Sequence, residues 1–238
     1  MPVSIQPGDP EQVRDLFDRI APAYDNLNDL LSLGLHRLWK RQAVAWLDPA
    51  PGQRLLDLCC GTGDLALVLA EKVRPGGLVL GLDAAAAPLE RARERARRQP
   101  WLPVEFRQGD ASATDLADGW ADGAVMAYGL RNLPDPAAGL QELRRLLRAG
   151  GRATVLDFNR PVNGRGATAA FQRFYLRQLV VPLARRAGLE DQYAYLERSL
   201  QLFPTGSEQE GLAREAGFTH VRHRLLAGGQ MGLLQLVA

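Results

Sequence analysis

Residues 55–66 read LLDLCCGTGDLA, an apolar run that enters a tight Gly-x-Gly turn and continues as an apolar helical pattern to Val73. That order predicts a strand, a turn and a helix. Because glycine has no Cβ, the backbone N–H groups of such a turn can approach a nucleotide closely. The stretch therefore predicts a nucleotide site at the end of a strand, and its neighbours in the sequence decide which nucleotide it holds.

Strand-like and helix-like patterns alternate around this turn. Strands are expected at 54–58, 78–83, 104–108, 124–128 and 152–158, and helices at 64–73, 88–98 and 136–148. Such alternation favours a mainly parallel, doubly wound α/β sheet. The last two strand-like runs, 220–226 and 231–237, have so short a loop between them that they must pair antiparallel. The sequence thus predicts a seven-stranded sheet that ends in a C-terminal antiparallel hairpin.

Helical patterns stand before and within this framework. Residues 13–20 and 27–46 carry apolar residues at helical spacing, and a Pro-rich loop at 48–52 ends them. We expect residues 1–50 to form a helical N-terminal cap and residues 51–238 to form the main domain. A long helical pattern at about 161–204, rich in arginine and aromatic residues, is expected to be an insert that faces the substrate.

Composition narrows the class of protein. The chain has 238 residues, 46% of them hydrophobic, and a net charge of +2, so nothing indicates a nucleic-acid partner. The only cysteines, Cys59 and Cys60, are neighbours and cannot form a disulfide framework, and no signal-peptide pattern or membrane-spanning run is evident. A cytoplasmic protein is expected, and a homo-oligomer stays open. No His, Cys or Asp cluster has metal-ligand spacing, so no metal is expected.

Two nucleotides fit the turn. Gly61 and Gly63, with Asp83 twenty residues further on, match the dinucleotide fingerprint, and an NAD-dependent reductase is one interpretation. However, Asp57 stands just before the turn, and Asp110 follows the third strand at the same edge of the sheet. With the terminal hairpin, these features resemble the class I S-adenosylmethionine-dependent methyltransferases.

That resemblance implies a set of cofactor contacts. Asp83 would bind the ribose hydroxyls, and Asp110 with its neighbour Ala111 would contact the adenine. The turn, made by Gly61, Thr62 and Gly63 and preceded by Asp57, would pass under the methionine part. The expected cofactor is S-adenosyl-L-methionine, which leaves as S-adenosyl-L-homocysteine.

The flanks of the sheet carry the closer resemblance. Residues 24–39 read YDNLNDLLSLGLHRLW, residues 129–132 read GLRN, and RLLRAGG at 145–151 leads into LDF at 156–158. These motifs resemble the ubiquinone/menaquinone biosynthesis C-methyltransferases over residues 12–238. Two departures, Arg148-Ala149 for the usual Lys-Pro and Asp157-Phe158-Asn159 for the usual Glu-x-Ser, resemble the cyanobacterial branch that completes phylloquinone. The implied acceptor is a prenylated naphthoquinol, 2-phytyl-1,4-naphthoquinol.

The resemblance also implies the acceptor-side residues. Arg131 and Asn132 follow the fourth strand, and with Tyr24 they are the quinol-side candidates. Our hypothesis is that Arg131 lowers the pKa of the quinol and that water, Tyr24 or His36 accepts its proton. The alternatives are methylation of demethylmenaquinol or another prenylquinol, an NAD-dependent oxidoreductase, and a non-catalytic nucleotide-binding or assembly protein on the same fold.

A prenyl tail confines the acceptor to a bilayer, so the protein has to meet a membrane. Residues 13–46 and 161–203 mix apolar residues with arginine, as interfacial helices do, and the alternative is that they are ordinary cap helices packed on the sheet. We expect peripheral contact with the cytoplasmic face of a membrane, which the resemblance implies is a thylakoid membrane. The basic run at 91–98 is interpreted as a solvated helix face.

Overall fold

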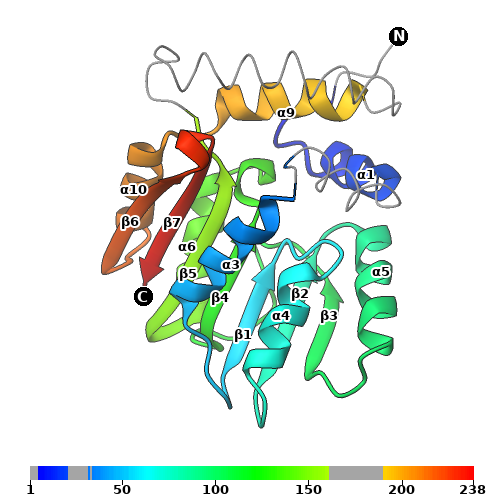
Figure 1. The fold of residues 1–238 in the computed structure, drawn as a ribbon. Coiled ribbons are helices and arrows are strands. Elements are labelled where there is room, and N and C mark those ends of the chain that lie inside the picture. Colours follow the sequence, from blue (N-terminus) through cyan, green and yellow to red (C-terminus); the bar gives the residue numbers. More distant parts are fainter. Residues whose placement is uncertain (1–4, 21–31, 33, 161–189) are drawn as a thin grey trace.

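The computed structural model describes residues 5–20, 32, 34–160 and 190–238, which form one seven-stranded sheet between two layers of helices (Figure 1). The strands are β1 (Arg54–Leu58), β2 (Leu78–Asp83), β3 (Val104–Gln108), β4 (Ala121–Ala127), β5 (Leu147–Phe158), β6 (His220–Leu226) and β7 (Met231–Val237). Their order is β3-β2-β1-β4-β5-β7-β6. The first five are parallel, and β7 runs antiparallel to both β5 and β6. The expected sheet and its C-terminal hairpin are confirmed.

Helices cover both faces of the sheet. They are α1 (Pro10–Ile20), α3 (His36–Leu47), α4 (Asp64–Lys72), α5 (Ala86–Arg97), α6 (Pro136–Leu146), α9 (Glu190–Leu202) and α10 (Gly206–Glu215). The helices α3, α4 and α5 pack on one face, and α6 and α10 pack on the other (Figure 1). The doubly wound arrangement follows from the right-handed connections between parallel strands.

Apolar side chains of the strands alternate between two hydrophobic cores, one on each face of the sheet. Leu55 packs with residues of α3 and α4, such as Leu69. Its neighbour Leu56 points to the opposite face and packs with Leu140 and Leu143 of α6. Successive strand residues face opposite sides, so a strand covered on both faces has to be apolar throughout. This explains why β1 carries buried leucines on both faces, at positions 55, 56 and 58.

The carboxyl edge of the sheet is covered by α1 and α9 (Figure 1). Side chains from both helices form a small third core around Leu16 and Tyr195. The other helix expected in the N-terminal cap, α3, lies against the sheet instead, where it contacts β4 and β5. Residues 21–31, 33 and 161–189 lie outside the described part of the chain, so the expected cap and insert stay predictions.

Candidate active site

A cavity of about 510 Å³ opens where β1, β2, β3 and β4 end. It lies at the switch point of the sheet, between β1 and β4, where open α/β sheets bind ligands. From the strand ends it is lined by Cys59, Gly61, Asp83, Gln108, Asp110, Ala111, Tyr128, Gly129 and Asn132, and from α1 by Pro10, Val13, Arg14 and Phe17. The strand ends thus supply most of the polar groups, and α1 supplies apolar side chains together with Arg14.

Backbone strain is concentrated at this cavity. Cys59 has a φ of 56° and Tyr128 a φ of 61°, a left-handed conformation that side-chain-bearing residues rarely adopt. The two strained residues end neighbouring strands. Between them Gly129 allows a close approach, because a Cβ there would lie 2.6 Å from the Cβ of Cys59. The turn after β1 and the turn after β4 are therefore held against each other.

Two of the predicted cofactor residues, Asp83 and Asp110, meet at this edge as expected. Asp83 accepts hydrogen bonds from the backbone N–H groups of Gly61 at 2.7 Å and Ala85 at 2.9 Å. Burial raises the pKa of Asp83, and these two N–H groups lower it in part. Asp110 is exposed and accepts a hydrogen bond from the N–H of Ser112 at 2.7 Å.

These residues suit an adenosine-containing ligand. Each oxygen of Asp83 takes one backbone donor, so further lone pairs are available to hydroxyl groups. A Cβ at Gly61 would meet no protein atom within 4 Å, so the backbone there borders open space. The cavity therefore combines the carboxylates of Asp83 and Asp110 with an unobstructed glycine turn that contacts Asp83, as the predicted S-adenosylmethionine site requires.

The other predicted cofactor residues do not line the cavity. Asp57 is 2% exposed and accepts a hydrogen bond from the N–H of Ala66 at 2.8 Å, which ties the start of α4 to β1. Thr62 is buried and its carbonyl oxygen accepts from Arg95. A Cβ at Gly63 would lie 2.8 Å from the ring of Phe106. These three residues hold the turn in place through contacts with the rest of the protein, and their contact with a cofactor stays a prediction.

Arg131 is held in a buried ion pair. Its Nη1 lies 2.6 Å from Oδ1 of Asp157, at the end of β5, and also donates to the carbonyl oxygen of Tyr128 at 3.1 Å. The guanidinium carbon lies 5.3 Å from the ring centroid of Phe158. Arg131 is not among the residues that line the cavity. Its charge is therefore balanced inside the protein.

Asn132, the next residue, does line the cavity. Its Nδ2 donates to the carbonyl oxygen of Tyr128 at 2.8 Å, and its Oδ1 accepts from the hydroxyl of Tyr195 on α9 at 2.9 Å. Burial raises the pKa of Tyr195 to about 12, so this phenol stays protonated as a donor. An amide has two N–H bonds and two oxygen lone pairs, so one of each is available to a ligand.

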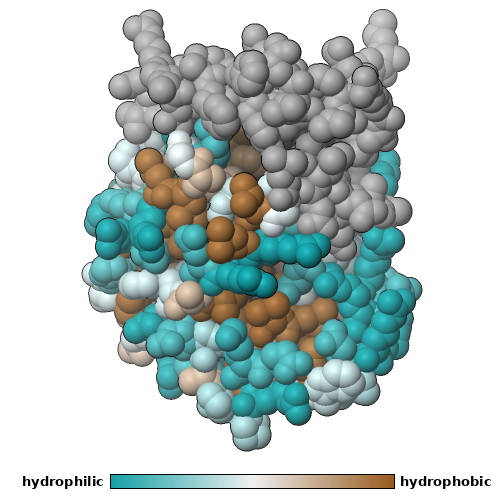
Figure 2. All heavy atoms as spheres, viewed as in Figure 1, coloured by the Kyte–Doolittle hydropathy of each residue, from teal (hydrophilic) through white to brown (hydrophobic). Residues whose placement is uncertain are grey.

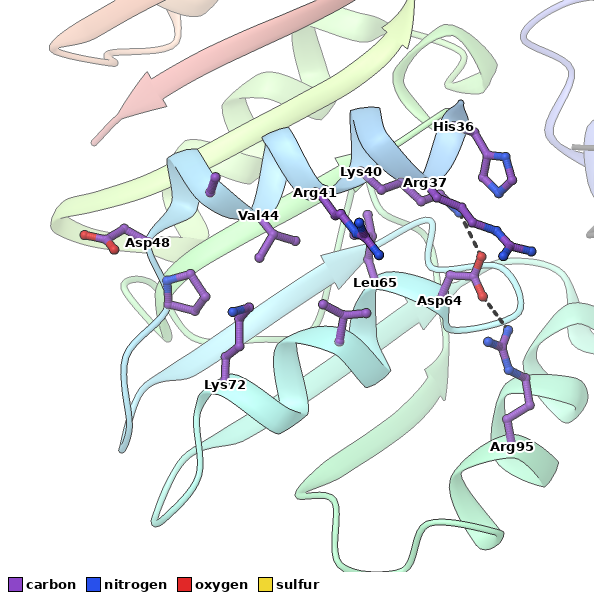
Figure 3. Close-up of a pocket in the computed structure, with 13 residues that line it drawn as sticks. His36, Arg37, Lys40, Arg41, Val44, Asp48, Asp64, Leu65, Lys72 and Arg95 are labelled. Carbon is purple, nitrogen blue, oxygen red and sulfur yellow. Dashed lines mark hydrogen bonds and ion pairs between the residues drawn. The ribbon is translucent and has the colours of Figure 1, made fainter. Parts of the chain in front are cut away.

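His36 lies elsewhere. It begins α3, is 5% exposed, and its Nδ1 is 2.7 Å from Oγ of Ser32. It borders a second cavity, between α3 and α4, rather than the one at the strand ends (Figure 3). Tyr24 lies outside the described residues. The catalytic roles expected of His36 and Tyr24 stay predictions.

Two residues of this site were not singled out from the sequence. Asp157 was noted only within a family motif, although an acid at the end of a central strand is a signal that could have found it. Tyr195 carried no such signal, because it meets Asn132 across 63 residues of chain.

A cysteine nucleophile has little support in the structure. Burial raises the pKa values of the Cys59 and Cys60 thiols, which disfavours the thiolate form of a nucleophile. Among the residues placed by the structure, no three His, Cys, Asp or Glu side chains gather as a metal-ligand set. Within the same ranges no helix is long and apolar enough to cross a bilayer.

Comparison with known proteins identifies close relatives. A model of the ubiE/COQ5 methyltransferase family matches residues 6–235. The 2-phytyl-1,4-naphthoquinone methyltransferase of Trichormus variabilis is 47% identical over 224 residues, which cover 94% of this chain and 97% of the relative. The chloroplastic enzyme of that name in Arabidopsis thaliana is 44% identical, over 93% of this chain and 85% of its own. Among solved structures, an S-adenosylmethionine-dependent methyltransferase from Aquifex aeolicus has a TM-score of 0.60 at 16% identity, covering 96% of this chain and 98% of that one.

Proposed function

The chain belongs to the ubiE/COQ5 methyltransferase family, and from that premise we propose that it methylates a ring carbon of 2-phytyl-1,4-naphthoquinol, completing phylloquinone. The donor is S-adenosylmethionine. Relatives that carry this activity in their names match almost the whole chain, so the substrate end as well as the nucleotide end of the site lies within the similarity.

The observation that carries the proposal is the composition of the strand-end cavity. Asp83, Asp110 and Asn132 all line it, and α1 adds apolar side chains together with Arg14. The carboxylates suit the hydroxyl and amino groups of an adenosine, while Asn132 suits a phenolic oxygen. One cavity thus offers complementary groups to the donor and to the acceptor, whose reacting atoms must meet.

When bound, S-adenosylmethionine supplies a methyl group on a sulfonium, which is an excellent leaving group. The quinol loses a phenolic proton, and its electron pair then forms the new carbon–carbon bond at the neighbouring ring carbon. The methyl carbon–sulfur bond would break at the same time, and the two electrons of that bond would stay on sulfur, which gives S-adenosylhomocysteine. Loss of the proton on the methylated carbon restores the aromatic ring.

We assign Asn132 to the acceptor and Arg131 to positioning. Asn132 can donate its second N–H to the developing phenolate, because Tyr128 and Tyr195 hold the amide from both sides. Arg131 is already paired with Asp157, and both side chains are nearly buried. Its main effect is therefore to fix the turn that presents Asn132, rather than to bring a mobile charge to the quinol.

A labelled methyl group tests the proposal directly. The protein is incubated with radiolabelled S-adenosylmethionine and with phytyl or polyprenyl naphthoquinols, and the oxidised quinones serve as controls. Transfer to the reduced phytyl compound supports the proposal. Equal or faster transfer to polyprenyl compounds would instead indicate that the substrate is a menaquinone precursor. Transfer to neither kind of naphthoquinol would reject the proposed function.

Ligand binding gives an independent check of the donor. S-adenosylhomocysteine should raise the melting temperature, because a ligand that binds only the folded state stabilises it. NAD should not. The same proposal places the protein at the surface of the membrane that holds the quinol, with contact that is peripheral.

A further inference from the structure

A second cavity, of about 810 Å³, lies outside the proposed active site, between α3 and α4 on one face of the sheet (Figure 3). We call it the basic groove. It is lined by the cationic residues Arg37, Lys40, Arg41, Lys72 and Arg95, the acids Asp48 and Asp64, His36, and the apolar residues Val44, Ala45, Pro49, Leu65 and Val68. Apart from His36, none of these residues has been assigned a part in methyl transfer.

Positive charge in the groove exceeds what its acids can balance. Asp64 is shared by Lys40 at 3.0 Å and Arg95 at 2.6 Å; burial alone would raise its pKa, but these cations lower it to about 2. Asp48 pairs with Arg152, which lies outside the groove. Arg41 and Lys72 are exposed and form no ion pair with the residues that the structure describes.

The excess is notable because the chain as a whole is nearly neutral. Its net charge is only +2, and its two lysines, Lys40 and Lys72, both line the groove. In Figure 3 the side chains of α3 reach toward α4, and Lys72 reaches back from α4, so cations approach the groove from both walls. An anionic partner is the complement of such a surface.

Exposed apolar side chains occur on the same two helices as these cations. Val68, which lines the groove, is 45% exposed, and Leu38, three residues before Arg41 on α3, is 49% exposed. Leu35, at the start of α3, is 48% exposed. Figure 2 shows hydrophobic residues on either side of a hydrophilic strip on this face. Basic side chains next to exposed leucines are typical of helices that lie in the headgroup region of a bilayer.

We propose that the basic groove docks the protein on a bilayer by binding anionic lipid headgroups, with Leu35 and Leu38 entering the lipid. Arg41 and Lys72 hold the headgroup charge, since Lys40 and Arg95 are engaged by Asp64 and Arg37 has another contact. The choice of a bilayer over another anionic partner rests on the proposed function, because a prenylated acceptor has to be reached in a membrane.

Vesicle sedimentation with three forms of the full-length protein tests the groove. They are the wild type, the double variant R41Q/K72Q, and the control R97Q/R98Q, which removes two exposed cations from the end of α5 outside the groove. Each is mixed with vesicles of phosphatidylcholine alone or with added phosphatidylglycerol. Each basic residue near an anionic surface contributes about 1 kcal/mol, so R41Q/K72Q should bind anionic vesicles roughly 30-fold more weakly.

The control should bind almost as the wild type does, and high salt should release all three. Leu38→Ser should also weaken binding without changing its salt dependence. Three results would overturn the proposal: wild-type binding that ignores phosphatidylglycerol, an equal loss in R97Q/R98Q, or stabilisation by inorganic phosphate with no vesicle binding. The last would make the groove a site for small anions.

The same variants separate this inference from the proposed function. Methyl transfer to detergent-dispersed quinol does not need docking, so R41Q/K72Q should reach the wild-type rate in detergent. With quinol in anionic vesicles, the rate of the variant should be lower than that of the wild type. Groove-dependent vesicle binding without any methyl transfer would reject the proposed function and leave the docking surface standing. Methyl transfer by a protein whose vesicle binding does not depend on the groove would reject the docking surface and leave the proposed function standing.

Discussion

The guanidinium of Arg131 and the carboxylate of Asp157 lie 2.6 Å apart, with side chains only 9% and 3% exposed. Oδ2 of Asp157 also accepts the backbone N–H of Arg131 at 3.2 Å, so one acid holds both the main chain and the side chain of its partner. The pair joins the end of β5 to the turn after β4. Its strength therefore controls where that turn presents Asn132.

Removal of Arg131 should destabilise the fold strongly. Arg131→Ala leaves the Asp157 charge buried without its partner, which typically costs about 3–5 kcal/mol. Arg148→Ala is the matched control, because Arg148 pairs with Asp122 while 60% exposed, and such surface pairs contribute about 0–1 kcal/mol. Urea unfolding measures both. Equal losses would show that burial of the Arg131 pair has no energetic consequence.

Arg131→Lys separates positioning from direct stabilisation of the phenolate. Lysine keeps the charge, but its side chain is shorter than that of arginine, so its ammonium cannot take the position from which Nη1 donates to Asp157 and to the carbonyl of Tyr128, and we expect a lower rate. If Arg131 acts by positioning, the pH dependence of the rate keeps its shape. A shift of that profile would instead indicate that Arg131 sets the pKa of the quinol. If Arg131→Ala and Arg131→Lys both methylate the quinol at near-wild-type rates, Arg131 neither positions Asn132 nor stabilises the phenolate.

Tyr195→Phe should impair the acceptor side of the site alone. The change deletes the 2.9 Å hydrogen bond to Asn132 and leaves the ring in the small core with Leu16. We expect a loss of about 1 kcal/mol in stability and a slower methyl transfer, with unchanged binding of S-adenosylhomocysteine. Ser199→Ala on the same helix removes only a local bond to the carbonyl of Leu196 and serves as the control. A matching loss of rate in both would assign the effect to α9 in general.

Periodicity located most of the sheet, because its strands are short apolar runs between turn residues. The expected bounds at 54–58, 78–83, 104–108, 220–226 and 231–237 agree with the structure. The helix expected to reach residue 148 instead ends at Leu146, and β5 begins at Leu147 rather than at residue 152. Leucines continue past the end of α6, so spacing alone could not locate that boundary, whereas pairing of Leu147 with Ala121 determines it.

The site was predictable where strand topology determines it. Acids at the carboxyl ends of parallel strands share one edge of the sheet, so the sequence alone predicted that Asp83 and Asp110 would lie in the same site. The pairs Arg131–Asp157 and Tyr195–Asn132 were not predictable, because they depend on side-chain conformations and on segments 26 and 63 residues apart. Nor did the sequence show that His36 would face the basic groove, since that depends on how α3 lies on the sheet.

Gly61→Ala should weaken cofactor binding more than it weakens folding. Its φ of 53° makes alanine unfavourable by about 1 kcal/mol, while the added methyl group meets no protein atom and enters the open space beside the turn. Isothermal titration with S-adenosylhomocysteine and urea unfolding measure the two effects. Gly150→Ala is the control, with a φ of 75° and equally open surroundings but no part in the cavity. Similar affinity in both variants would contradict a cofactor beside Gly61.

Asp57→Asn should flatten the pH dependence of stability. Burial raises the pKa of Asp57 from 3.8 to about 7, against the opposing effects of the Ala66 N–H and Lys40. Between these values the unfolded chain has released the proton and the folded chain retains it, so the free energy of unfolding falls as the pH rises. Each pKa unit corresponds to about 1.4 kcal/mol, and the decline ends above pH 7.

Asparagine cannot ionise but can still accept the N–H of Ala66 through its amide oxygen, so the turn should keep its shape. Urea unfolding across this pH range should therefore give the variant a shallower decline than the wild type. Asp115→Asn, which changes an exposed carboxylate, should keep the wild-type slope. If Asp57→Asn also keeps that slope, Asp57 is ionised in the folded protein throughout, and the turn that holds the nucleotide is built around a buried charge that Lys40 stabilises.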